Sequence, residues 1–537
     1  MQTDVLVIGS GAAGMYAAIA AARSGASVAL VDRSLIGRGG ATVMAQMTVA
    51  AALGEETPDH WERHLADTLN AGRGLCDAAL SQILCEEAPE CIREMDRWGV
   101  GWARTKKHIK QVQAPGHDRP RCVYVDFVNT GPAVSKTLRA QLNRIPEIRR
   151  IGEVLITDLA VQEGICVGAY GVHVTSGEPL SFNAKATIVA TGGLTRLYQR
   201  NSASINMGGD GYALALRAGA ELVDMEFVQF FPIGHLAPRL VGMDPIMWDP
   251  FRYKLGGKLL NADLQEFLQE EGHYVSARDR ATYAILKEVA AGRGSPHGGA
   301  WLSFQHCSEA ELRSAFGPVI DRLAANGIDL TREPVEVAPM AHYHMGGIRA
   351  DTDMRTTLPH LFAAGEAVGG ANGANRLSGN AIPEAFTFGC RAGLRAAALA
   401  AKTAMPSIDH TTKNGPSGSF ASTVNAAAQI AALQRVMNED VGPLRSRTGL
   451  ERALEHIAGL EEACAELPTP KRGLDPEWID LHDLRNMRLV AECITRAALA
   501  RTESRGAHQR EDFPETQAQW QRHQKLHLAS EGLRLEG

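Results

Sequence analysis

A glycine-rich turn near the amino terminus has the residue types and spacing of a site for nucleotide phosphates. Gly9, Gly11 and Gly14 follow a short apolar run and open an alanine-rich segment that we expect to be helical to about residue 23. The first glycine permits a tight turn, the second lets the backbone approach a pyrophosphate, and the third lets helix and strand pack closely. Because the free N–H groups of the helix start then face the phosphates, the turn predicts a dinucleotide site.

An acidic residue stands where such a site needs one. A second apolar segment, predicted as a strand over residues 27–31, ends in Asp32, which is placed to accept hydrogen bonds from a pair of ribose hydroxyls. A glycine turn alone is common between strands and helices, but here strand, turn, helix, strand and acid occur together and in register. The unit favours a doubly wound α/β domain that begins at the extreme amino terminus.

Later segments favour FAD over NAD. One predicted strand contains Val154, another runs into Ala190-Thr191-Gly192, and a third, over residues 361–364, leads into Gly365-Glu366. In FAD-binding folds of this kind a late acid commonly binds the ribityl chain, which an NAD site does not need. We therefore expect the chain to leave its nucleotide domain, build another part and return to complete the site.

Composition limits the functional classes. The chain has 537 residues, of which 45% are hydrophobic and 22% charged, with a formal net charge of −6 and a mean hydropathy of −0.14. No apolar run reaches the roughly 18 residues that a membrane span needs, and no basic stripe with interleaved aromatics suggests nucleic-acid binding. We expect a cytoplasmic protein without direct membrane insertion, and membrane association through partner subunits is left open.

The cysteines give no metal-binding pattern. Nine are scattered along the chain without a CxxC pair: Cys76, Cys85, Cys91, Cys122, Cys166, Cys307, Cys390, Cys464 and Cys493. We expect reduced thiols and no bound metal. An iron-sulfur centre that exchanges electrons with this protein would have to lie on another chain.

Further motifs follow the glycine turn in a fixed order. They are Ala41-Thr-Val-Met-Ala-Gln46, Gly208-Gly-Asp210-Gly211, Met225-Glu-Phe-Val-Gln-Phe230, Ser276-Ala-Arg278-Asp279, His342-Tyr-His-Met-Gly-Gly347, Gly373-Ala-Asn-Arg376-Leu and Glu503-Ser-Arg-Gly-Ala-His508-Gln-Arg-Glu-Asp-Phe-Pro514. Over nearly its whole length the chain resembles the flavoprotein subunits of succinate dehydrogenase and fumarate reductase, with L-aspartate oxidases close behind and adenylylsulfate reductases as further relatives.

The resemblance implies a domain organisation. A Rossmann-like FAD-binding domain would comprise residues 1–225 and 341–402, an inserted α+β capping domain residues 226–340, and a linker with a helical carboxy-terminal domain residues 403–537. Independently, residues 403–423 are rich in Ser, Thr, Pro and Gly, which is typical of a linker. Apolar residues then recur at helical spacing around Leu433 and again around Met487, which predicts the core of a helical bundle.

The resemblance also implies a set of cofactor-binding residues beyond the glycine turn. With those already named, the set is Gly9, Gly11, Ala12, Ala13, Gly14, Asp32, Arg33, Gly40, Ala41, Thr42, Gln46, Val154, Ala190, Thr191, Gly192, Asp210, Glu366, Arg376, Ala381 and Ile382. Members of the family that carry flavin covalently have a His at the position of Ala41. Because alanine has no nucleophile, we expect FAD to be bound non-covalently.

The implied chemistry is hydride transfer between flavin N5 and a carbon next to a carboxylate-bearing carbon. Arg376 matches the family's carboxylate-binding Arg, and His342 matches its substrate-binding His. A planar guanidinium can bind a carboxylate through two parallel hydrogen bonds, which Lys cannot. The capping domain is the expected lid, since water would weaken these contacts and quench the reduced flavin.

The remaining substrate positions depart from the family. Phe231 replaces a second carboxylate-binding His, and Met47-Thr48 replaces a glycine pair after Gln46. When the glycine pair at 256–257 is aligned, the proton-shuttling Arg of the family falls on Tyr253. Arg252 is one residue out of register, so Tyr253, Arg252 and Lys254 are all candidate proton donors. Asn372 also replaces a His of the respiratory members.

These departures leave three hypotheses. The favoured one is a dehydrogenase or reductase flavoprotein subunit that acts on a small acidic substrate other than simple succinate or fumarate and passes electrons to an iron-sulfur partner. The second is a free-standing oxidase similar to L-aspartate oxidase, which the expected non-covalent flavin and the chain length would suit. The third is a flavin-containing assembly subunit that has lost catalysis.

Overall fold

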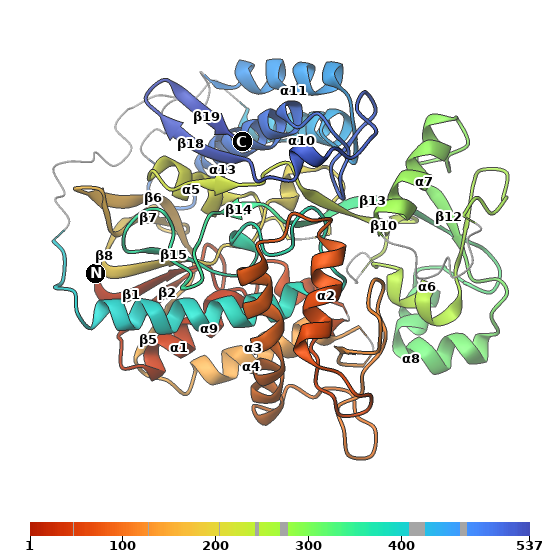
Figure 1. The fold of residues 1–537 in the computed structure, drawn as a ribbon, viewed down its shortest axis with the longest axis horizontal. Coiled ribbons are helices and arrows are strands. Elements are labelled where there is room, and N and C mark those ends of the chain that lie inside the picture. Colours follow the sequence, from red (N-terminus) through yellow and green to blue (C-terminus); the bar gives the residue numbers. More distant parts are fainter. Residues whose placement is uncertain are drawn as a thin grey trace.

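The computed structural model describes residues 1–46, 48–126, 128–202, 204–241, 246–268, 278–407, 425–461 and 470–537. Figure 1 shows three parts: a sheet flanked by helices that holds the amino terminus, a lobe at one side built around α6, α7 and α8, and a helical layer with the carboxy terminus. This arrangement confirms the predicted α/β fold with an inserted α+β lobe. The domain boundaries stay predictions.

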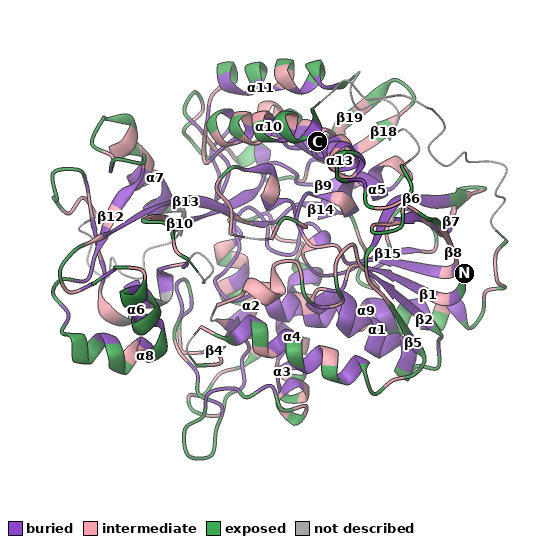
Figure 2. Cartoon of the chain, turned by 180° about the vertical axis from the view of Figure 1, so that it is seen from behind, coloured by how far each residue is buried: buried purple, intermediate pink, exposed green. Residues whose placement is uncertain are grey.

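The first part is built on a seven-stranded sheet in the order β5-β2-β1-β8-β7-β6, with β15 also paired to β8. β1, β2, β5, β8 and β15 are parallel, whereas β6 and β7 add an antiparallel edge. The strands are β1 (Gln2–Ile8), β2 (Val28–Val31), β5 (Ile148–Ile151), β6 (Val154–Gln162), β7 (Ile165–His173), β8 (Pro179–Val189) and β15 (Leu361–Ala363). The central parallel strands are buried, as near-continuous apolar runs predict (Figure 2).

Helices cover this sheet and frame its carboxyl edge. They are α1 (Ala12–Arg23), α2 (Trp61–Ala71), α3 (Ala78–Arg97), α4 (Thr130–Leu142), α5 (Asp210–Arg217) and α9 (Ala381–Ala400). α9 returns the chain to the first domain and packs closely on α1: a Cβ at Gly389 would lie 2.5 Å from Ala13 O, and one at Gly393 would lie 2.3 Å from Ala17 O. Short elements complete the part: η1 (Thr42–Met44), η2 (Thr195–Leu197), η4 (Gly365–Ala367), β3 (Val49–Ala50), β4 (Cys122–Val123), β9 (Leu222–Val223) and β14 (Gly347–Ile348).

The side lobe is an antiparallel sheet in the order β10-β13-β12-β11 with three helices. Its elements are β10 (Val228–Ala237), α6 (Asp249–Leu255), β11 (Lys258–Leu260), α7 (Arg278–Ala290), β12 (Ala300–Ser303), α8 (Glu309–Ala325) and β13 (Val335–His344). β10 and β13 pair from Val228 with His344 out to Ala237 with Glu336. Both strands therefore reach from the sheet domain into a separate apolar core in the lobe, and the predicted boundary at residue 341 falls inside β13.

The carboxy-terminal part contains the predicted bundle and also a β-hairpin. Its elements are α10 (Ala426–Asp440), β16 (Leu444–Arg445), α11 (Arg447–Gly459), α13 (Pro476–Ala500), β17 (Gln509–Arg510), η5 (Ala518–Trp520), β18 (Lys525–Ala529) and β19 (Gly532–Glu536). β18 pairs with β9 of the first part, so the chain end is a strand rather than a helix. Most of the predicted linker lies outside the described residues. Among the helices that are described, none is long and apolar enough to cross a membrane.

Candidate active site

A large cavity of about 390 Å³ joins the glycine turn to the side lobe. Its wall includes the carboxyl end of the parallel strands, the first turn of α1, the loop after β2, the segment 110–115, and residues from β10, β13 and α9. Ligands of doubly wound folds bind at this edge of the sheet, because the loops that follow the strands gather there. The cavity therefore has the position expected of a dinucleotide site, and its wall extends to residues of the side lobe.

The glycine turn has the geometry that its sequence predicts. Gly9 has φ +103°, and a Cβ there would lie 2.4 Å from Ala190 O, while one at Gly14 would lie 1.8 Å from Gly9 O. These two glycines allow β1, α1 and β8 to meet. Gly9 also lines the cavity, as do Gly11 and Gly40, and at Gly40 a Cβ would meet nothing within 4 Å. Side chains at positions 11 and 40 would occupy the cavity, so the cradle fits a bound pyrophosphate.

Asp32 lines the cavity but is also an anchor of the loop around it. Its Oδ2 accepts hydrogen bonds from Ser10 N (2.8 Å) and Ser10 Oγ (2.6 Å), and its Oδ1 accepts from Ser34 N and Ser34 Oγ, both at 2.8 Å. A carboxylate has about four acceptor sites. A ribose hydroxyl at Asp32 would therefore share or replace one of these bonds.

Glu366 is a half-buried carboxyl on the cavity wall. It follows β15 in η4, and its Oε1 accepts a hydrogen bond from His344 N at 3.0 Å. Burial raises the pKa of Glu366 to about 8. A Cβ at Gly193 would lie 2.2 Å from Glu366 Oε1, so glycine at that position gives the carboxyl its space. Glu366 is the acid predicted to bind the ribityl chain.

Two predicted cofactor residues are held by the carboxy-terminal part. Arg33 and Asp210 both line the cavity. Arg33 binds Asp483 of α13 through two hydrogen bonds, at 2.8 and 3.0 Å, and Asn486 of α13 donates to Asp210 at 2.8 Å. The sequence reasoning missed Asp483 and Asn486, because nothing in a helical pattern reveals which distant loop a polar position contacts.

Nearly all predicted cofactor residues line this one cavity. Besides those described above they are Ala12, Ala13, Ala41, Thr42, Gln46, Val154, Ala190, Thr191, Gly192, Arg376, Ala381 and Ile382. Gly14 packs behind the wall. The Thr42 hydroxyl accepts a hydrogen bond from Ala12 N at 2.9 Å, so it satisfies one of the free N–H groups of the first turn of α1.

His342 of β13 and Phe231 of β10 face each other where the side lobe borders the cavity. Both line the cavity, and their ring centroids are 5.3 Å apart with the planes tilted by 58°. Ser202 Oγ lies 2.8 Å from His342 Nδ1 and fixes the orientation of the imidazole. An apolar ring therefore borders the polar group predicted to bind substrate.

Arg376 lies over an aromatic ring. Its guanidinium carbon is 4.3 Å from the centroid of the Tyr343 ring, and both residues line the cavity. Gln229 donates a hydrogen bond to Arg376 O at 2.9 Å and thereby fixes the backbone of this segment. Arg376 Nη1 also donates a hydrogen bond to Leu377 O at 3.4 Å, and the flat contact with the ring orients the guanidinium at the cavity wall.

The predicted proton donors are not brought to the wall in the described part of the chain. Arg252 is buried in α6, with 2% of its surface exposed, and does not line the cavity. The side chains of Tyr253 and Lys254 lie outside the described residues, as do Met47 and most of the 276–279 motif. α6 still borders the site, because Asp249 at its start lines the cavity.

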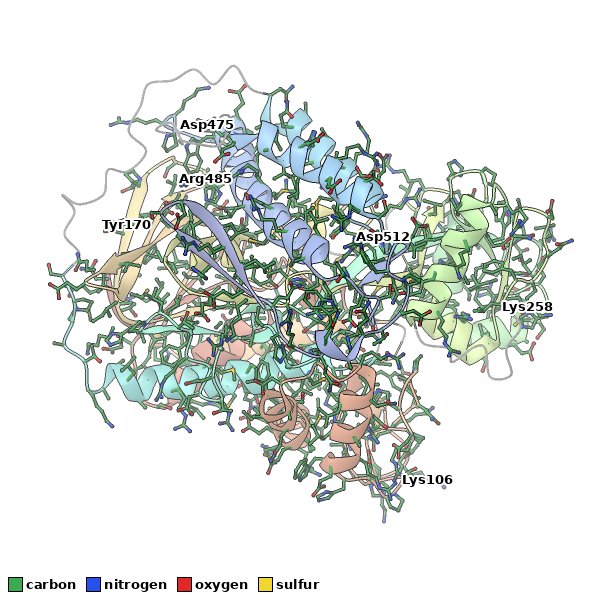
Figure 3. The ribbon with its side chains drawn as sticks, turned by 45° about the horizontal axis from the view of Figure 1, so that its top comes forward. Lys106, Tyr170, Lys258, Asp475, Arg485 and Asp512 are labelled. Carbon is green, nitrogen blue, oxygen red and sulfur yellow. The ribbon has the colours of Figure 1, made fainter. Side chains whose placement is uncertain are left out.

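The segment between α3 and β4 contributes cavity residues that the sequence reasoning missed. Lys110 and Gln113 line the cavity, while Lys106 of the same segment points away from the body of the molecule (Figure 3). This segment is held against the residues after Arg376, since His117 Nε2 is 2.6 Å from Ser378 O. Its irregular backbone gave no periodic signal in the sequence.

The side lobe closes over the cavity. Met247 N donates a hydrogen bond to Gln46 Oε1 at 3.1 Å, which joins the lobe to the loop after β2. Tyr283 of α7 donates to Gly506 O at 3.0 Å and joins the lobe to the carboxy-terminal part. The lobe thus has the position of a lid.

Comparison with known proteins identifies the class of protein. Residues 4–382 match the FAD binding domain family, and residues 430–536 match the fumarate reductase flavoprotein C-terminal family. These matches cover both the cavity and the helical layer behind it. The protein is an FAD-dependent oxidoreductase.

Individual relatives show to which family of FAD-dependent oxidoreductases the chain belongs. The chain is 36% identical to a subunit of the fumarate reductase (CoM/CoB) of Methanothermobacter marburgensis, over 97% of this chain and 96% of that protein. It is 34% identical to the L-aspartate oxidase of Streptomyces coelicolor, over 98% and 92%. The structure of Mycobacterium smegmatis Sdh1 in complex with UQ1 superposes with a TM-score of 0.88 at 34% identity, over 99% and 92%. The chain belongs to the succinate dehydrogenase and fumarate reductase flavoprotein family.

We expect acid precipitation of the holoprotein to release essentially all FAD into the supernatant. Ala41 lines the cavity and offers no atom that could bond to the flavin. The measurement is the absorbance spectrum of supernatant and washed pellet. Yellow colour that stays with the pellet would reveal a covalent attachment at another residue.

Proposed function

We propose that this protein is a dehydrogenase or reductase for a carboxylic acid that carries an apolar group where succinate and fumarate carry a second carboxylate. The proposal is supported by the observation that Arg376, His342 and Phe231 line one cavity, with the Phe231 and His342 rings in contact. Arg376 and His342 suit one acidic group, and Phe231 suits an apolar one. Bound FAD supplies the hydride acceptor or donor.

The residues of the chain hold and orient the substrate in this proposal. The Arg376 fork binds the carboxylate, and its contact with the Tyr343 ring fixes the direction of the fork. His342, oriented by Ser202, donates or accepts a second hydrogen bond to the acid. The lid excludes water, which strengthens both polar contacts.

The proton donor is proposed to come from Tyr253, Arg252 or Lys254. Arg252 would have to turn from its buried position to reach the cavity. Positioned acid–base catalysis contributes roughly 10² to 10⁴ in rate. The only arginine near Tyr253 in the sequence, Arg252, is one residue away from the position of the family's proton-donating Arg. This is a second reason why small dicarboxylates should turn over slowly.

We propose an iron-sulfur protein as the electron-transfer partner. The described cysteines are free thiols, mostly buried, and lie apart from the cavity. The relative from Methanothermobacter is one of the subunits of a fumarate reductase, and its match covers 97% of this chain. Partner binding would also allow association with a membrane without a spanning helix in this chain.

A free-standing oxidase is the second candidate, favoured by the 34% identity to the Streptomyces L-aspartate oxidase. The two candidates differ in their electron acceptor. Iron analysis of the complex purified from its native source separates them: iron in proportion to flavin supports the partner, and rapid oxygen consumption without iron supports the oxidase.

The substrate proposal is tested by steady-state oxidation of a reduced dye with fumarate and with a panel of bulkier unsaturated acids that includes trans-cinnamate. We expect the best bulky acid to have a kcat/KM at least about tenfold above that of fumarate, since an apolar group in an apolar pocket is worth roughly 1 to 3 kcal/mol. Fumarate as the best acid of the panel would contradict the assignment of Phe231.

A further inference from the structure

A buried carboxyl lies directly behind the proposed carboxylate clamp. Glu384, in the first turn of α9, is 1% exposed and does not line the cavity. Its Oε2 accepts hydrogen bonds from Tyr343 OH and from Asn372 Nδ2, the latter at 2.8 Å. Its Oε1 is buried and has no hydrogen-bond partner among the described residues. An ionised carboxylate in this state is only half satisfied.

Tyr343 links this carboxyl to the cavity. One face of its ring lies under the Arg376 guanidinium, at 4.3 Å from the guanidinium carbon, while its hydroxyl reaches Glu384. Burial holds the pKa of Tyr343 well above its usual value, so the hydroxyl stays protonated and remains the donor. Glu384 and the cavity are thus separated by one aromatic ring.

The other charged or titratable groups around Glu384 oppose its ionisation or are neutral. Glu366 is a second carboxyl in electrostatic contact with it, and because the pKa of Glu366 is raised to about 8 it is mostly protonated near pH 7. Burial holds the pKa of Tyr212 well above its usual value and lowers that of His344 to about 4, so both are neutral near pH 7. Arg376 is the cation that favours ionised Glu384 in this group of residues.

We propose that Glu384 takes up a proton when an anionic ligand pairs with Arg376 in the cavity. The inference rests on the proposed function, in which Arg376 binds the carboxylate of the substrate. The incoming carboxylate neutralises the charge that favours ionised Glu384, while burial and the unsatisfied oxygen continue to oppose ionisation. Glu384 is then a positioning residue that couples substrate binding to protonation.

The direction of the pH dependence follows from these contacts. Burial raises the pKa of Glu384 to about 7 against the opposing effects of Tyr343, Asn372 and Arg376. Once the anion pairs with Arg376, the pKa of Glu384 rises further. Between these two values Glu384 is ionised in the free protein and protonated in the complex. Anion affinity is therefore greatest below about pH 7 and falls about tenfold per pH unit above it, up to the pKa of the complex.

The test is calorimetric titration of the oxidised holoprotein with trans-cinnamate, and in parallel with fumarate. Neither acid can turn over on oxidised flavin without a reductant. Titrations in two buffers of different ionisation enthalpy, at several pH values from 6 to 9, give the number of protons taken up per anion. We expect uptake to approach about one proton above pH 7 in the wild type and to be lost in Glu384→Gln.

Three variants distinguish Glu384 from the other groups that could hold this proton. In His342→Gln and Glu366→Gln, titrated at saturating anion, the number of protons taken up per bound anion between about pH 7 and 8 should stay as in the wild type. Arg376 also acts on Glu366, but the pKa of Glu366 is about 8, so uptake that appears only above pH 8 would belong to Glu366. Tyr343→Phe keeps the ring under Arg376 but removes a donor to Glu384, so the uptake should move to higher pH. Flavin content by absorbance and circular dichroism confirm that each variant is folded and loaded. If Glu384→Gln does not fold, the shift in Tyr343→Phe still tests the proposal.

The outcomes separate this inference from the function it rests on. Binding of either anion without proton uptake, or uptake that persists in Glu384→Gln and disappears in His342→Gln, would overturn the role of Glu384 alone. If neither anion binds to flavin-loaded wild type, the carboxylate clamp itself is wrong and both proposals fail.

Discussion

Arg376→Lys is expected to lower turnover at least about a hundredfold while the fold and the flavin content stay unchanged. Lys keeps the positive charge but loses the planar fork that holds a carboxylate through two bonds, and it loses the flat contact with the Tyr343 ring. A hundredfold loss corresponds to about 2.7 kcal/mol of transition-state stabilisation. The measurement is kcat/KM with the best acid of the panel, alongside the ratio of flavin to protein.

A small effect would assign Arg376 to structure instead. A loss of less than threefold, with flavin content unchanged, would mean that another group binds the substrate acid. Loss of flavin together with activity would mean that Arg376, which is also one of the predicted cofactor residues, acts through the cofactor rather than on the substrate.

Phe231→His is expected to shift selectivity from bulky acids to fumarate. Phe231 is 1% exposed and contacts the ring of His342 from within the cavity wall. A second imidazole there would pair a carboxylate that now meets an apolar ring, a gain of about 1 to 3 kcal/mol. We expect kcat/KM for fumarate to rise about ten- to a hundredfold and that for cinnamate to fall, as measured in the dye assay.

Phe230 supplies a matched control for this substitution. It precedes Phe231 on β10, faces away from the described cavity wall and packs edge-on against Tyr198 at 5.1 Å between centroids. Phe230→Leu should leave the ratio of the two kcat/KM values within about twofold of the wild type. A similar selectivity change in both variants would point to distortion of β10 rather than to a contact with the substrate.

The cofactor half of the site could be predicted from sequence because its signals are local. The turn from Gly9 to Gly14 requires glycine for reasons of backbone geometry that the neighbouring residues reveal, and the structure confirms the strand, turn and helix around it. The fold class was likewise predictable, since apolar runs and helical periodicity fix the types of the elements.

The contacts between elements were not predictable in the same way. Arg33 donates a hydrogen bond to Asp483, which is 450 residues away in the sequence, and Tyr343 donates one to Glu384, which is 41 residues away. Each pair depends on how α13 or α9 packs, which no local pattern encodes. The docking of the β18–β19 hairpin on β9 was not predictable because β9 lies about 300 residues earlier, as the contact from Gln524 N to Asp224 Oδ1 illustrates. The hairpin itself is a local pairing of consecutive strands.

The α6 segment illustrates a limit of aligning motifs by their glycines. When the glycine pair is aligned, the position of the family's proton-shuttling Arg falls on Tyr253. In the structure the neighbouring Arg252 does not line the cavity. The slow turnover that we propose for small dicarboxylates would then follow from two separate features, the ring of Phe231 and a changed proton donor.

The most direct test of the proposed function is reoxidation of the photoreduced flavin in a rapid-mixing experiment without oxygen, dye or partner protein. Mixed with trans-cinnamate or another bulky unsaturated acid of the panel, the flavin should reoxidise in a single exponential whose rate saturates with acid concentration and falls at least about a hundredfold in Arg376→Lys. Fumarate should reoxidise it far more slowly. Reoxidation by fumarate at tens per second or faster, on the order of an ordinary enzyme turnover, together with no reaction of the bulky acids, would contradict the account.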